Sequence, residues 1–125
     1  MAEKQTAGRN ELRTFAPKFA ELNDDVLFGD VWSREKQLSP RDRSLVTVTT
    51  LMAQGLTDSA FRFHLKNAKK NGITREEIAE ILTHAAFYAG WSNAWAAFRM
   101  AKEVWSEGIG NDAMAKHAAS MVFPI

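Results

Sequence analysis

The stretch Asn71-Gly72-Ile73-Thr74-Arg75-Glu76-Glu77-Ile78 marks the clearest boundary between two helices in this chain. Asn71-Gly72 is a typical stop for the preceding helix, because glycine readily adopts the left-handed conformation that ends many helices. Thr74 and Glu77 have the spacing of a capping box, in which each side chain accepts a hydrogen bond from the other residue's backbone N–H. The stretch therefore predicts one helix ending at Gly72 and another beginning after Thr74.

Apolar residues recur at helical spacing on both sides of this boundary. In the segment that begins after Thr57, the i, i+3, i+4 and i+7 positions are Phe61, His64, Leu65 and Ala68. This pattern places His64 inside an apolar stripe. In the segment after Thr74, the apolar stripe consists of Ile78, Ile81, Leu82, Ala85 and Ala89. His84 and Tyr88 are one turn apart at the edge of that second stripe.

A further helix is predicted from Ser39 to Gly55. Ser39 supplies a capping hydroxyl, and Pro40 suits the first helical position because its missing N–H needs no partner there. The interior Val46–Thr50 is β-branched, which by itself favours a strand. Helix is nevertheless the better prediction, because four apolar residues recur at helical spacing. They are Leu45, Val48, Leu51 and Met52.

The segment after Gly90 has an unusually wide apolar face. Ser92 is a candidate cap, and the apolar residues cover more than half of the helix circumference. They are Trp95, Ala97, Phe98, Ala101, Val104 and Trp105. Such a face indicates two packing partners, one of which can be another subunit.

Length and composition fit one all-α domain. Short helices are expected from Glu11 to Leu22, with Pro17 early in the helix or kinking it, and from Asp24 to Arg34. An amphipathic helix is expected over 111–122. The chain has 125 residues, 46% hydrophobic and 25% charged, as in ordinary globular domains. We therefore predict a single-domain helical bundle of about six or seven helices over residues 1–125.

Composition also limits location and partners. No apolar run reaches the roughly 18 residues needed to cross a bilayer, and the polar N-terminus has no signal-peptide core, so a cytoplasmic protein without membrane contact is expected. Sixteen basic and fifteen acidic residues leave a net charge of +1 without a basic cluster, which argues against nucleic-acid binding. Cysteine is absent, which excludes disulfides and cysteine-dependent catalysis.

Six sequence blocks stand in a characteristic order. They are Gly29–Arg34, Arg43-Ser44-Leu45, Arg62-Phe63-His64-Leu65, Asn71–Ile78, Tyr88-Ala89-Gly90 and Ala96-Ala97-Phe98. Their order and spacing together resemble the carboxymuconolactone decarboxylase family, which is related to alkylhydroperoxidase D. The resemblance implies an alkylhydroperoxidase D-like helical fold assembled as a ring-like homo-oligomer, a trimer or a hexamer.

Two positions depart from the pattern of that family. Its decarboxylase members commonly carry glutamate where this chain has Ala60, and cysteine where it has Ala89. The peroxidase branch depends on a Cys-x-x-Cys pair, so the dithiol mechanism is excluded here. The first interpretation is a decarboxylase-like lyase, and the alternative is a non-catalytic small-molecule-binding or scaffold oligomer. A third, an antioxidant peroxidase, would require a mechanism without thiols.

Loss of carbon dioxide from an unsaturated lactone acid requires a cation for the carboxylate, an apolar wall and a proton donor. Arg43 is the candidate for the carboxylate, and His64 and His84 are candidate proton donors near neutral pH. The candidates for the wall are Trp32, Phe87, Tyr88 and Trp91. Neither a metal nor an organic cofactor is expected, and the three histidines offer no close ligand pair.

Each candidate also has a purely structural interpretation. A histidine in an apolar stripe is often a core residue with one hydrogen bond, and Arg43 can pair with a carboxylate such as Asp42 of a neighbouring chain. The tryptophans can serve as core or interface anchors. An enzyme predicts a pocket where Arg43, His64 and His84 converge, whereas a scaffold predicts these side chains held in ion pairs and hydrogen bonds.

Overall fold

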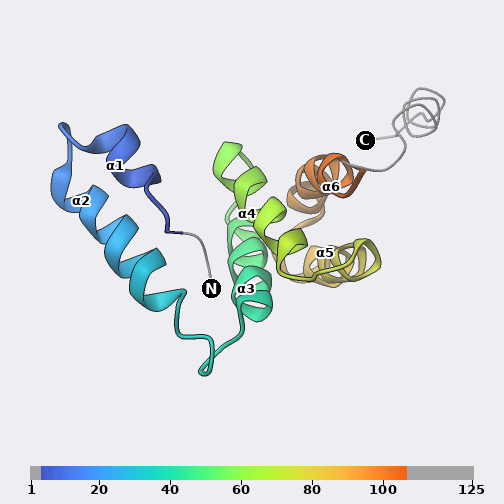
Figure 1. Cartoon of the computed structure of the whole chain (residues 1–125). Helices are drawn as coiled ribbons and strands as arrows, with labels where there is room; N and C mark the ends of the chain where they lie inside the picture. Colours follow the sequence, from blue (N-terminus) through green and yellow to red (C-terminus); the bar gives the residue numbers. More distant parts are fainter. Residues whose placement is uncertain (1–3, 107–125) are drawn as a thin grey trace. The chain divides into compact units, whose positions relative to one another are not determined.

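The computed structural model describes residues 4–106, in which all regular secondary structure is helical (Figure 1). The elements are α1 (Ala7–Leu12), α2 (Pro17–Glu21), η1 (Leu22–Val31), α3 (Pro40–Ala53), α4 (Ser59–Lys70), α5 (Arg75–Ala89) and α6 (Trp91–Ser106). The all-α prediction is therefore confirmed. The chain forms two compact units, Met1–Arg43 (unit 1) and Ser44–Ile125 (unit 2), whose boundary falls inside α3. The helix predicted over 111–122 lies outside the described residues.

In unit 1, Pro17 decides where the helices begin and end. The prediction of one helix from Glu11 to Leu22 is wrong, because α1 ends at Leu12 and α2 begins at Pro17. Proline has no N–H to donate and is tolerated at the first position of a helix, where it stands in α2. The predicted break before Asp24 is also absent, since the chain continues from α2 into η1 with helical backbone angles at Leu22.

The segment η1 is wound more widely than an α-helix. At its end the N–H of Trp32 donates to the carbonyl of Leu27, five residues earlier, at 3.0 Å. This is the hydrogen-bond spacing of a π-helix, which is rare and short in most proteins. The helix ends at Val31, three residues earlier than the sequence predicts. Propensity along the chain does not distinguish a π-helix from an α-helix, so this feature was not predicted.

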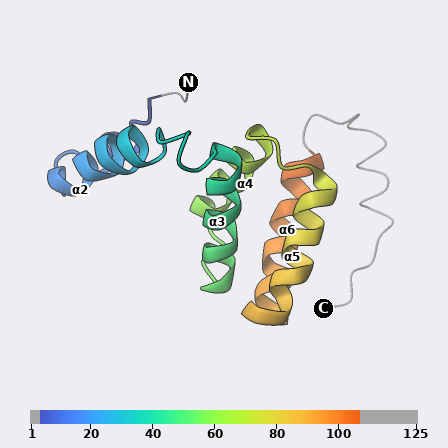
Figure 2. The same ribbon diagram turned by 90° about the horizontal axis from the view of Figure 1, so that it is seen from below.

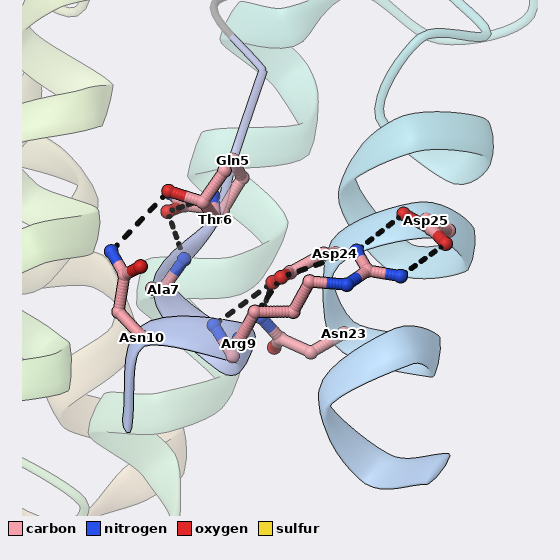
Figure 3. A network of polar contacts seen from close by, with 9 residues as sticks. Gln5, Thr6, Ala7, Arg9, Asn10, Asn23, Asp24 and Asp25 are labelled. Atoms are coloured by element: carbon pink, nitrogen blue, oxygen red, sulfur yellow. Dashed lines mark hydrogen bonds and ion pairs between the residues drawn. The ribbon is translucent and has the colours of Figure 1, made fainter. Parts of the chain in front are cut away.

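Asp24 links η1 to the start of α1 through hydrogen bonds (Figure 3). Its buried carboxylate accepts hydrogen bonds from the backbone N–H groups of Gly8 and Arg9, at 2.9 and 3.0 Å, and from the Asn23 amide at 3.0 Å. The Arg9 guanidinium also binds Asp25 through two hydrogen bonds of 2.8 Å. Burial raises the pKa of Asp24, but the hydrogen bonds outweigh it and lower the pKa below its ordinary value. Asp24 thus acts as a cap for α1 from a distant part of the sequence.

Gly8 is required by this close approach. A Cβ at position 8 would lie 2.8 Å from the carbonyl oxygen of Ala20 and 2.8 Å from a carboxylate oxygen of Asp24. We expect Gly8→Ala to lower the free energy of unfolding by about 1–3 kcal/mol, although alanine normally stabilises a helix relative to glycine. Urea denaturation measures this change. The control, Glu11→Ala on the exposed side of α1, should stay within about 0.5 kcal/mol of wild type, and a stabilised Gly8→Ala variant would contradict the predicted clash.

Helix α3 forms despite its β-branched interior. The N–H of Asp42 donates to the Ser39 hydroxyl at 3.1 Å, as the predicted cap requires. Val48 and Met52 are fully buried, and Leu45 and Leu51 pack against the same core. Tertiary packing of this apolar face outweighs the weak local preference for a strand, and the prediction of a helix is confirmed.

The boundary between α4 and α5 has the predicted geometry. The N–H of Glu77 donates to the Thr74 hydroxyl at 3.1 Å, and the N–H of Thr74 donates to the Glu77 carboxylate at 3.0 Å, which completes the capping box. Gly72 has a φ of +100°, the left-handed region expected after a helix. At the other end of α4, the cap is Asp58, whose carboxylate accepts from two backbone N–H groups.

Helices α5 and α6 lie side by side and run antiparallel (Figure 2). The predicted cap at Ser92 is wrong, because α6 already begins at Trp91. Gly90, with a φ of +103°, makes the turn within one residue and leaves no room for a separate capping residue. At the other end of the pair, the Trp105 indole donates to the carbonyl of Ile73 at 3.0 Å and ties the end of α6 to the start of α5.

One hydrophobic core joins the helices of unit 2. Helix α6 packs against both α4 and α5, and the Arg62–Glu103 ion pair and a hydrogen bond from Lys69 to the carbonyl of Val104 add polar links to α4. The largest fully buried apolar side chains are Phe61, Met52, Leu65, Ile73, Leu82, Val48 and Val104. None of the helices described between residues 4 and 106 is long and apolar enough to span a bilayer.

Candidate functional site

Two of the sequence blocks that carry the family resemblance touch each other in unit 2. Ser44, from the Arg-Ser-Leu block, is buried with 1% of its surface exposed. Its hydroxyl accepts a hydrogen bond of 2.9 Å from the amide of Asn71, the residue that ends α4. A buried hydroxyl without a partner would destabilise the fold, so this contact explains both residue types structurally.

His64 lies half-buried on α4, as its place in the apolar stripe predicts. Its ring meets the edge of Phe63, with centroids 5.0 Å apart and planes at 77°. Burial lowers the pKa of His64 below its ordinary value of 6.5, because the apolar surroundings disfavour the charged imidazolium. The neutral ring therefore predominates at neutral pH, where it can accept a proton.

The lowered pKa of His64 makes stability depend on pH. As pH falls through 6.5, the unfolded chain binds a proton at this residue before the folded chain does, so the free energy of unfolding decreases. We expect the free energy of unfolding to decrease more between pH 7 and pH 5 for wild type than for His64→Gln. The extra decrease cannot exceed the effect of one additional proton bound by the unfolded chain. Urea denaturation across this range measures the difference. Identical pH profiles for the two proteins would contradict it.

His84 lies on the surface of α5, one turn from Tyr88. The two rings are 5.2 Å apart and tilted by 34°, and Tyr88 is 84% exposed. The predicted proximity of His84 and Tyr88 is thus present. The two histidines nevertheless belong to different aromatic pairs, because His64 packs against Phe63.

Phe87 and Trp91 form a second surface pair across the turn at Gly90. Their centroids are 5.8 Å apart with planes at 73°, and the side chains are 76% and 60% exposed. The end of α5 and the start of α6 therefore present three exposed aromatic rings, from Phe87, Tyr88 and Trp91. Such exposed apolar surface is typical of a binding or association site.

An open groove with a volume of about 550 Å³ lies between α5 and α6 in unit 2. Of the predicted site residues in unit 2, only Trp91 lines it. The lining residues are Arg75, Ile78, Ala79, Thr83, Ala86, Trp91, Ala94, Trp95, Phe98, Arg99, Ala101, Lys102 and Trp105. The wide apolar face of α6 was the sequence signal for this surface, but the side chains that α5 contributes were not predicted.

Trp32 and Arg43 belong to unit 1. Half-buried Trp32 stacks on Phe28, with centroids 6.1 Å apart and planes at 18°. Arg43 is also half-buried, and its guanidinium donates a hydrogen bond of 3.1 Å to the carbonyl of Arg34. This bond holds Arg43 against the loop that connects η1 to α3. Within residues 4–106, no three side chains of the metal-binding types gather at one point.

Comparison with known proteins identifies the family. The model of the carboxymuconolactone decarboxylase family matches residues 17–103, which include parts of both units. A protein of Acinetobacter baylyi named 4-carboxymuconolactone decarboxylase is 38% identical over 96 residues, covering 77% of this chain and 70% of the relative. The chain therefore belongs to the carboxymuconolactone decarboxylase family.

Proposed function

We propose that this protein is a decarboxylase that acts on a small carboxylated lactone or a related unsaturated acid. The observation that carries the proposal is the 38% identity to a protein named 4-carboxymuconolactone decarboxylase, over most of both chains. The proposal treats residues 1–125 as one functional domain, since the family match includes parts of both compact units. Family membership without cysteine leaves acid–base chemistry as the natural mechanism.

In the proposed reaction, His64 is the residue that transfers the proton. Loss of carbon dioxide leaves an electron pair on carbon, delocalised as a dienolate, and a proton must be delivered to that carbon. The half-buried imidazole of His64 is suited to this transfer because it is largely neutral at pH 7 and can take up a proton from the substrate or solvent and pass it on. His84 is the second candidate for the same role. No metal or organic cofactor takes part in this scheme.

Arg43 is proposed to bind the substrate carboxylate. A guanidinium binds a carboxylate in a fork of two hydrogen bonds, and the existing bond from Arg43 to the carbonyl of Arg34 fixes the direction of the side chain. The proposed apolar contacts to the substrate come from Trp32, Phe87, Tyr88 and Trp91. Exposed aromatic rings at the α5–α6 turn also support assembly into a trimer or hexamer, which we propose for the cytoplasmic protein.

A binding or scaffold role is the alternative. One observation favours it: the groove between α5 and α6 contains neither His64 nor His84. The alanines at positions 60 and 89, where decarboxylase members commonly carry glutamate and cysteine, point in the same direction. In this case the family fold would bind a small carboxylate without converting it.

Turnover of 4-carboxymuconolactone by the purified wild-type protein, followed by ultraviolet absorbance, decides between these functions. A decarboxylase consumes the lactone and releases carbon dioxide in equal amounts, over many turnovers per protein chain. Binding detected by calorimetry without any consumption of the lactone would support the alternative and contradict the proposed activity. Absence of both binding and consumption would exclude this lactone as the ligand and contradict the substrate proposed here.

A further inference from the structure

The groove between α5 and α6 presents an apolar surface of the kind that a packed helix normally covers. It is lined mainly by apolar side chains, among them the half-buried Trp95 and Phe98 and the 60% exposed Trp91. The charged residues in its lining are Arg75, Arg99 and Lys102, all of them basic. Arg99 lies 5.6 Å from the centre of the Trp95 ring, in a cation–π contact.

The chain leaves α6 directly beside this groove. Trp105 is part of the lining and Ser106 is the last residue of α6, after which residues 107–125 follow. In that segment Met114, Ala118 and Met121 stand at i, i+4 and i+7, on one face of the predicted helix over 111–122. Lys116 falls on the opposite face. The pattern is therefore that of a helix with a narrow apolar stripe.

We propose that residues 107–125 of the same chain occupy the groove, with Met114, Ala118 and Met121 against its apolar wall. A helix over 111–122 is roughly 18 Å long at about 1.5 Å per residue, and α6, at roughly 24 Å, is long enough to support it. In the proposed arrangement the segment turns back after Ser106 and runs antiparallel to α6.

Charge and connectivity favour this occupant. The first six residues of the segment include two acidic ones, Glu107 and Asp112, whereas the charged residues of the groove lining are all basic. Because the segment is tethered at Ser106, its effective concentration at the groove exceeds that of a segment from a separate chain. Burial of methionine and tryptophan side chains against each other removes apolar surface from water and supplies the driving force.

Cross-linking tests the proposed contact, and the cysteine-free sequence makes it specific. In the proposed arrangement Met114 lies near the start of α5, where Ala79 is exposed in the groove. The double variant Ala79→Cys, Met114→Cys is treated with a short bis-maleimide. Its matched control is Glu80→Cys, Met114→Cys, because Glu80 is also exposed but does not line the groove.

We expect the Ala79 pair to form a link within one chain about tenfold faster than the Glu80 pair, measured by denaturing gel and peptide mass spectrometry. Equal rates for the two pairs would overturn the proposal. A link between two chains would also overturn it, since the occupant would then be the segment of a second copy.

Tryptophan fluorescence gives an independent test. Three of the four tryptophans, Trp91, Trp95 and Trp105, line the groove, so Trp32→Phe leaves only groove reporters. In this background Met121→Glu should shift the emission to longer wavelength and increase quenching by acrylamide about twofold, because a carboxylate cannot be buried against the apolar wall. Lys116→Glu, on the opposite face, should leave both unchanged. Equal spectra for the two variants, with circular dichroism showing both folded, would overturn the proposal.

Discussion

Replacing His64 by glutamine should lower the kcat for decarboxylation of 4-carboxymuconolactone by about a hundredfold or more. A positioned acid–base group typically contributes a factor of about 10²–10⁴, and glutamine retains the shape and polarity of the side chain without its ability to transfer a proton. The loss is measured by ultraviolet absorbance at saturating lactone. Circular dichroism confirms that the variant is folded.

His84→Gln is the matched comparison, because His84 has the same chemistry but lies on the surface of α5. If His64 transfers the proton, His84→Gln retains most of the wild-type kcat. Loss of activity in His84→Gln alone would reverse the two roles. The pH profile adds a second criterion: burial lowers the pKa of His64 in the free protein, so we expect the limb of the kcat/KM profile due to this residue below pH 6.5.

Removal of the Phe61 ring should be the most destabilising single truncation in unit 2. Phe61 is the largest of the fully buried side chains, with 0% of its surface exposed, and lies in the core shared by α3, α4, α5 and α6. Phe61→Ala should lower the free energy of unfolding by about 3–5 kcal/mol through lost burial and the cavity that remains. Urea denaturation, monitored by circular dichroism, measures the change.

Phe63 provides a control on the same helix. Its side chain is 42% exposed, so Phe63→Ala loses less buried area and should cost roughly 1 kcal/mol or less. Because the Phe63 ring touches His64, the same variant also tests whether that contact matters for activity. A Phe61→Ala variant no less stable than Phe63→Ala would contradict the central position of Phe61 in the core.

Three helix boundaries, at the start of α3, the end of α4 and the start of α5, could be predicted because their signals are local. The capping box of Thr74 and Glu77, the left-handed Gly72 and the Ser39 cap each depend on residues within a few positions along the chain. The predicted cap at Ser92 was wrong because Gly90, with a φ of +103°, completes the turn in one residue and α6 begins at Trp91.

The candidate site was less predictable than the fold. Helical spacing correctly placed His64 in a half-buried position and His84 beside Tyr88, because both relations lie within one helix. Spacing cannot tell which faces of different helices meet. It therefore gave no indication that the groove of unit 2 would contain Trp91 but neither histidine.

The sequence by itself determined the helical class, the family, the caps at Ser39 and Thr74 and the absence of thiol chemistry, since these depend on residue types and on short spacings. Only the tertiary structure decided that Asp24 caps α1 across the sequence, that η1 is a π-helix, and that Phe87, Tyr88 and Trp91 are exposed. The physical reason is the range of the interactions. Caps and periodicity act within one or two helical turns, whereas burial, groove formation and pKa shifts depend on which distant segments pack together.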